Sequence, residues 1–202
     1  MTLSETLGIS ETQERLLARA LQLVLFGVLA VGVVTVRAQL IVTGGITFGV
    51  SLLPALLRRE YNYSMDMGLI LWITVAMILH VAGALALYEQ FQWFDEIAHT
   101  VSGTLIAGIG YASFRALELH SDVIDVPSEF RAGFILVFVL AAGVFWEVLE
   151  FVFSGFVTVY GVDDIVTDFI FNAVGGVIVA VWGTGYARGL VGFFRRRLRR
   201  SE

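Results

Sequence analysis

Six long apolar segments constrain the fold of this chain more than any other feature of its sequence. A helix needs about 20 apolar residues to cross the hydrocarbon core of a bilayer, which is roughly 30 Å thick. Each segment is predicted to be a transmembrane helix, because a helix satisfies its own backbone polar groups inside a membrane. If the second, short segment is included, the six lie at about 17–37, 40–57, 67–88, 94–116, 132–153 and 165–187.

The composition excludes a soluble domain. Of the 202 residues, 57% are hydrophobic and 15% are charged, whereas soluble domains average about 45–50% apolar and 25% charged residues. The chain has no cysteine, which excludes disulfides and thiolate chemistry. No repeat or long linker divides it. We therefore predict one all-α integral membrane domain over residues 1–202, a polytopic helical bundle that binds the lipid bilayer and no nucleic acid. The sequence leaves its oligomeric state open.

The arginines predict the orientation of this bundle. Positive charge collects on the cytoplasmic side of short loops. With the N-terminus inside, the outer loops carry only Arg37, and the remaining connections that hold arginine all lie inside. This indicates six spans with both termini in the cytoplasm, in the cell membrane. Residues 188–202 are then a basic cytoplasmic tail, and we expect the following arginines to contact anionic lipid head groups: Arg195, Arg196, Arg197, Arg199 and Arg200.

Two local patterns refine the predicted helices. Ser10 followed by Gln13 is typical of a capping box, which would start a helix leading into the first apolar segment. The second segment contains Gly44–Gly45 and Pro54, so a bend or tilt is expected there.

Polar side chains recur at helical spacing near the outer ends of the last four segments. Residues three or four apart share a helix face, and four residues rise about 6 Å. With the predicted topology, Asp95, Glu150 and Asp164 form one layer. A second layer one turn deeper consists of His99, Glu147 and Asp168. The candidate polar residues in and beside these segments are His80, Asp95, His99, Ser102, Glu147, Glu150, Asp164, Asp168 and Asn172.

Five carboxylates at one depth require compensation, because like charges in an apolar environment repel one another. No arginine lies at this level of any predicted span, so shared protons, a bound cation or a metal ion would have to balance them. Carboxylates with imidazole suit divalent Zn, Mn or Mg. Glu150 and His80 are the candidate acid and base residues. The candidate metal ligands are Asp95, His99, Glu147, Asp164, Asp168 and Asn172.

Three classes of function fit this pattern. The first is a metal-dependent hydrolase or transferase that acts on a lipid or lipid-linked head group at the outer surface. The second is a proton- or cation-coupled transporter or channel, although the inner halves of the spans offer no polar path. The third is a structural membrane protein held together by its polar core. Simpler roles also fit single residues: Asp95 and Asp164 as helix N-caps, Glu150 as a solvated interface residue and His80 as a packing residue.

Three motifs resemble the YjdF-like family of prokaryotic inner-membrane proteins. They are HVAGALALYEQFQWFDEIAHTVSG, GVFWEVLEF and DDIVTDFIFNAVGG, within residues 67–185. The family pattern contains H-x-x-G followed by Tyr, D-x-x-x-H-x-x-x-G, W-E-x-x-E and D-x-x-x-D-x-x-x-N-x-x-G. The resemblance implies a multi-pass inner-membrane protein with this polar set, and it implies no reaction. Glycines that match are Gly103 and either Gly175 or Gly176.

Overall fold

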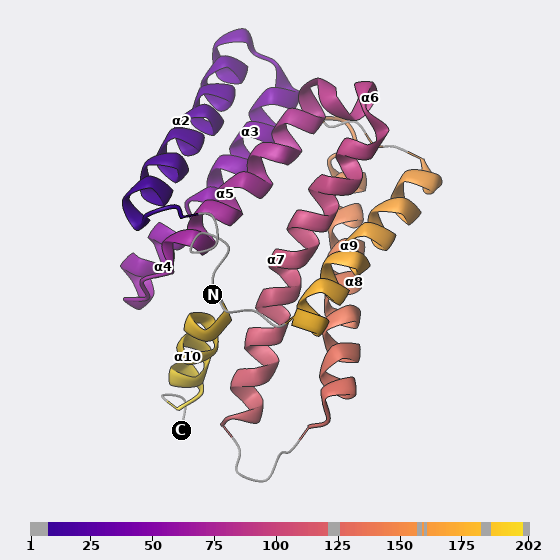
Figure 1. The fold of residues 1–202 in the computed structure, drawn as a ribbon. Coiled ribbons are helices and arrows are strands. Elements are labelled where there is room, and N and C mark those ends of the chain that lie inside the picture. Colours follow the sequence, from indigo (N-terminus) through magenta and orange to yellow (C-terminus); the bar gives the residue numbers. More distant parts are fainter. Residues whose placement is uncertain (1–7, 121–125, 157–158, 160, 183–186, 200–202) are drawn as a thin grey trace.

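Every element of the described chain is a helix, which confirms the all-α prediction for that part (Figure 1). The computed structural model describes residues 8–120, 126–156, 159, 161–182 and 187–199. Residues 183–186 of the last predicted span and Arg200 lie outside them. The elements are α2 (Glu11–Thr35), α3 (Ala38–Ser51), α4 (Leu53–Tyr61), α5 (Met67–Ala82), the π-helix η1 (Gly83–Leu87), α6 (Tyr88–Gln90), α7 (Gln92–Glu118), α8 (Ser128–Val152), α9 (Val162–Trp182) and α10 (Ala187–Leu198).

Four helices of the described chain are long and apolar enough to cross a membrane, or five if a bent pair counts as one span. The four are Glu11–Thr35, Met67–Gln90, Ser128–Val152 and Val162–Val181, and the bent pair joins α3 to α4 at 44°. The capping box is present at the start of α2, where Ser10 and Gln13 bond each other's backbone. The bend lies at Leu52, two residues before Pro54. Of the two features that predict a bend, Gly44–Gly45 and Pro54, the structure therefore has it at the proline.

The predicted segment 94–116 coincides with α7, which is not among the sufficiently apolar helices. With 27 residues, α7 extends about 40 Å, so its length alone would cross a bilayer. Its position explains its lower apolarity, because α7 packs against α5, α8, α9 and α10. A helix enclosed by protein presents fewer side chains to lipid, so it can carry more polar residues than a lipid-facing helix.

The helices form two three-helix units. The helices α2, α3 and α5 pack on one another, and so do α7, α8 and α9. The two units meet along α5 and α7. In Figure 1 the first unit lies on the left, the second on the right, and the short α6 lies at the top between them. The helices α4 and α10 lie toward the opposite end of the bundle.

Two glycines allow α7 and α9 to approach closely. A Cβ atom at Gly175 would lie 2.5 Å from the backbone nitrogen of Thr104, and one at Gly103 would lie 2.8 Å from the carbonyl oxygen of Asn172. Close approach through small residues is typical of packing between membrane helices. Of the two glycines that match the family motif, Gly175 therefore faces α7, whereas Gly176 faces Leu136 of α8.

A third close approach joins α2 to α3. A Cβ atom at Gly44 would lie 2.8 Å from the backbone nitrogen of Leu29. The helix α3 continues through Gly44–Gly45 without a break. Gly44 therefore serves packing, and the bend in this segment lies next to Pro54.

Residues 187–198, which overlap the predicted basic tail, form the helix α10, which packs on α7. Leu190 is buried in a cluster with Leu69 and Ala112. The Phe193 ring stacks on Tyr63 at 4.5 Å, and the guanidinium carbon of Arg197 lies 4.3 Å above the Tyr61 ring. At least one of the tail arginines is therefore engaged by the protein itself.

The crossing of α7 and α9 gives a direct test of this packing. Gly175→Ala should lower the stability of the detergent-purified protein by about 1–3 kcal/mol, because the added methyl overpacks a backbone contact. Gly49→Ala is the matched control, since a Cβ atom there meets nothing within 4 Å. Thermal unfolding would measure both variants. Equal midpoints for the two variants would contradict the assigned crossing.

Candidate functional site

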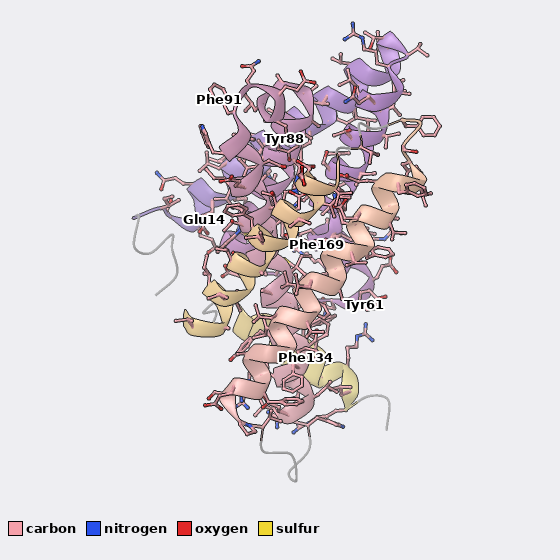
Figure 2. All side chains as sticks on the ribbon, turned by 90° about the vertical axis from the view of Figure 1, so that its right-hand side faces the viewer. Glu14, Tyr61, Tyr88, Phe91, Phe134 and Phe169 are labelled. Atoms are coloured by element: carbon pink, nitrogen blue, oxygen red, sulfur yellow. The ribbon has the colours of Figure 1, made fainter. Side chains whose placement is uncertain are left out.

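A cavity of about 260 Å³ lies between the two three-helix units. Polar residues near one end of α5, α7, α8 and α9 line it, together with Tyr88 of α6. Figure 2 shows Tyr88, one of its lining residues, near the upper end of the bundle, with Phe169 of α9 further down. The predicted polar residues that line the cavity are His80, Asp95, His99, Glu150, Asp164 and Asp168.

His99 joins two carboxylates from different helices. Its Nε2 atom lies 3.4 Å from Oδ1 of Asp95, one turn away on α7, and 3.3 Å from Oδ1 of Asp168 on α9. The side chains of His99 and Asp168 are each 9% exposed, and that of Asp95 is 17% exposed. On the other side of the ring, Nδ1 lies 3.4 Å from Nδ2 of Asn172. The close crossing of α7 and α9 produces this arrangement, because it sets one polar stripe against the other.

The three residues could together hold a metal ion. One potential ligand atom from each of Asp95, His99 and Asp168 lies within 4.8 Å of the other two. In a tetrahedral zinc site with bonds of about 2.0–2.1 Å, adjacent ligand atoms are roughly 3.3–3.4 Å apart. The two distances from Nε2 match this spacing. Moreover, Oδ1 of Asp95 is buried and has no hydrogen-bond partner in the described part of the chain.

His80 belongs to a separate hydrogen-bonded chain beside this group. Its Nδ1 lies 2.9 Å from the Tyr88 hydroxyl, and its Nε2 lies 3.1 Å from Oγ of Ser102. Ser102 donates its own proton to the carbonyl of Ala98 at 2.7 Å. The tautomer of His80 decides which ring nitrogen donates and which accepts, so Tyr88 and Ser102 are the hydrogen-bond partners of its two nitrogens. The His80 ring lies edge-on to His99 at 5.3 Å, so the two imidazoles are neighbours with different partners.

The π-helix η1 brings Tyr88 to His80. In a regular α-helix, residues eight apart are about 80° apart around the axis, whereas one extra residue in a turn restores a common face. η1 supplies that wider turn between them. Gly83 allows the Tyr88 ring to lie against the backbone, because any Cβ atom at Gly83 would overlap that ring.

The remaining predicted site residues differ in their placement. Glu150 accepts a hydrogen bond of 2.9 Å from Trp146 Nε1, and both line the cavity. Asp164 lines the cavity but is outside the three-ligand group. Asn172 lies beside the far nitrogen of His99 and is not among the residues that line the cavity. Glu147 lies on α8 outside the cavity lining.

In the structure, neither Asp95 nor Asp164 is the N-cap of its helix. The N-cap of α7 is Phe91, which makes Asp95 the fourth residue of the helix. The helix α9 begins at Val162, so Asp164 lies within its first turn.

Several lining residues were not predicted from the sequence. The helix α3 contributes Gln39, Thr43 and Thr47 to the cavity wall. The spacing of four between the two threonines was a readable signal of a common face. Tyr88 and Trp146 also line the cavity. Only the three-dimensional structure shows that their side chains form hydrogen bonds with His80 and Glu150.

The fold and this cavity define a multi-pass α-helical membrane protein with a buried Asp–His–Asp group near one end of its bundle. A family model described as "Predicted membrane protein (DUF2238)" matches residues 17–189. The chain belongs to this family of predicted membrane proteins, and its resemblance to YjdF-like proteins is consistent with that membership. No curated protein and no solved structure matches the chain.

The hydroxyl of Tyr88 gives a test of the hydrogen-bonded chain. Tyr88→Phe should destabilise the protein by about 1–3 kcal/mol, because Nδ1 of buried His80 loses its hydrogen-bond partner. Tyr111→Phe is the control, since the described residues offer its hydroxyl no hydrogen bond. Thermal unfolding in detergent measures both. A Tyr88→Phe midpoint no lower than that of the control would contradict the hydrogen bond between Tyr88 and His80.

Proposed function

We propose that this protein is a metal-dependent membrane enzyme, a hydrolase or transferase, with a lipid or lipid-linked substrate. The observation that carries the proposal is the group of Asp95, His99 and Asp168 at the wall of a cavity. Three protein ligands with a fourth position open are typical of catalytic zinc sites, whereas structural sites are closed by four. A metal ion held there would activate water and stabilise developing negative charge.

The ligand set is smaller than the six residues predicted from the sequence. Zn²⁺ or Mn²⁺ suits one imidazole and two carboxylates better than Mg²⁺, which prefers oxygen. Binding at Nε2 requires His99 to carry its proton on Nδ1. Asn172 would then present its amide oxygen, by turning the amide from the arrangement with Nδ2 toward Nδ1. An outer partner of this kind orients a histidine ligand.

Glu150 and His80 are the proposed acid and base groups. Glu150 lines the cavity directly, within reach of a bound molecule. His80 also lines it, and its chain through Tyr88 and Ser102 gives it two proton-bearing neighbours. Asp164 adds a carboxylate to the same wall. Glu147 has no assigned role, because it lies outside the cavity lining.

A transmembrane relay is less well supported than an enzyme. On the inner side of Asn172, residues Ala107, Ile135, Val139 and Val179 form a buried apolar cluster. Buried hydroxyls nearby bond their own helix, as Thr104 does to the carbonyl of Thr100. The described interior therefore supports a site that opens at one end only.

Metal analysis tests the proposed function. Protein purified in detergent and reloaded with Zn²⁺ or Mn²⁺ should hold about one metal ion per chain. His99→Ala and Asp168→Asn should lose it, because each removes one of three ligands. Asn172→Asp should bind metal more tightly, since a carboxylate accepts the Nδ1 proton more strongly.

Two matched controls separate ligand loss from general damage. Asp163→Asn changes an exposed carboxylate in the same first turn as Asp164, and His120→Ala changes a histidine beyond the far end of α7. Both should retain the metal. Wild-type protein without stoichiometric metal after reloading would refute the proposed function.

We further propose six spans with both termini in the cytoplasm, with α7 as the fourth span and the cavity toward the outside. The support is electrostatic: Arg115 and Arg131 bind Glu118 where α7 ends and α8 begins, and the arginines of α10 follow α9. These cationic residues belong to the predicted inner side.

Because the chain has no cysteine, single cysteines report this topology directly. Gly155→Cys, between α8 and α9, should react with a membrane-impermeant maleimide added to intact cells. Glu129→Cys, at the start of α8, should react only after permeabilisation. The reverse pattern would establish the opposite orientation, and equal outside labelling would mean that α8 does not cross.

A further inference from the structure

We propose that the substrate is a cationic amphiphile, an ammonium head group on an apolar chain, and that it enters the cavity from within the bilayer between α3 and α8. This inference rests on the proposed function, because it takes Asp95 and Asp168 as metal ligands and assigns the remaining carboxylates to the substrate.

The cavity has one wall that helix packing leaves open. The helix α3 lines it with Val42, Ile46 and neighbouring residues, and α8 lines it with Leu149 and Phe153. The helix α3 packs on α2 and α5, and α8 packs on α7 and α9. No comparable packing joins α3 to α8 in the described chain. Two membrane helices that share a cavity without sealing it leave a lateral route.

The side chains along this route are apolar and exposed. Ile46 on α3 is 39% exposed, and Phe153 at the end of α8 is 40% exposed. Exposed apolar side chains at membrane depth contact acyl chains. An alkyl chain lying between α3 and α8 would therefore remain in a hydrocarbon environment while its head group lies in the cavity.

The volume of the cavity limits what enters it. Pockets that enclose drug-sized ligands have volumes of about 300–1,000 Å³, and this cavity measures about 260 Å³. It is large enough for a head group and too small for a whole lipid. The apolar remainder of the substrate must stay outside, which the lateral opening permits.

The charge of the lining favours a cation. Four carboxylates line the cavity, and no lysine or arginine does so among the described residues. A divalent metal at Asp95 and Asp168 leaves Glu150 and Asp164 without a cation. An anionic head group would meet both of these carboxylates, whereas an ammonium group neutralises one of them.

The aromatic side chains of the lining favour an ammonium group over other cations. Trp146, Tyr88 and Phe153 line the cavity together with the carboxylates, and aromatic faces bind quaternary ammonium groups through cation–π attraction. The hydrogen bond from Trp146 to Glu150 fixes the indole beside a carboxylate. Glu150 would then contact the head group directly, as a catalytic acid or base must.

A series of soluble probes tests head group and chain separately. Binding to detergent-purified, metal-loaded protein would be measured by calorimetry with tetramethylammonium, butyltrimethylammonium and octyltrimethylammonium, and with octyl glucoside and octyl phosphate. Affinity should rise with chain length, by about fourfold for each methylene that is buried. Octyl phosphate should bind at least tenfold more weakly than octyltrimethylammonium.

Variants in the cavity and along the route test where octyltrimethylammonium binds. Asp164→Asn should weaken octyltrimethylammonium and leave the metal content unchanged. Leu149→Trp should abolish the dependence on chain length, because it fills the route between α3 and α8. Val148→Trp is the matched control, because it introduces the same side chain at the neighbouring position. Val148 is 52% exposed and is not part of the cavity lining.

The outcomes separate this inference from the proposed function, because metal content is measured on the same samples. Metal-loaded protein that binds octyl phosphate or octyl glucoside as tightly as octyltrimethylammonium would overturn the cationic head group. Loss of chain-length dependence in Val148→Trp as well as in Leu149→Trp would overturn the route. Absence of metal from the wild type would refute the proposed function instead.

Discussion

The close approach of α7 to α9 is the constraint on which the rest of the site depends. Gly103 and Gly175 leave no room for a Cβ atom at the crossing. One turn from it, His99 of α7 meets Asp168 and Asn172 of α9. Ionisable groups in an apolar surrounding are costly unless they are compensated. Each helix alone would present an expensive polar stripe, and the crossing brings His99 of one stripe within reach of Asp168 and Asn172 of the other.

A second constraint follows from the division into two three-helix units. The units meet along α5 and α7, so their other helices diverge and leave the cavity between them. The π-helix η1 adapts α5 to this junction, because it turns Tyr88 onto the face that carries His80. The cavity is therefore a consequence of how the two units join.

Much of this arrangement could be predicted from the sequence, because spans and polar stripes depend on local periodicity. The spacing of four in Asp95/His99 and Asp164/Asp168, with an orientation from the arginines, predicts that these residues meet at one depth. The structure places Glu147 apart from the other predicted residues, because it lies outside the cavity lining. On α8, Trp146, Glu150 and Phe153 share the face that lines the cavity, and Glu147 is about 100° around the helix from Trp146.

Other features depend on contacts between distant segments. The wider turn of η1 has no pattern of its own beyond Gly83, and the contribution of α3 to the cavity depends on how the two units dock. The low apolarity of α7 likewise becomes intelligible only when its neighbours are known, since enclosure by protein replaces contact with lipid. The cysteine-labelling experiment tests the prediction that α7 is a span.

We propose that Asp95, His99 and Asp168 hold one divalent metal ion at the cavity wall. X-ray absorption spectroscopy of the zinc-loaded protein tests it most directly. We expect a first shell of nitrogen and oxygen at about 2.0–2.2 Å, with outer-shell scattering from a single imidazole that disappears in His99→Ala. A zinc spectrum with no imidazole, or one unchanged by His99→Ala, would contradict the account.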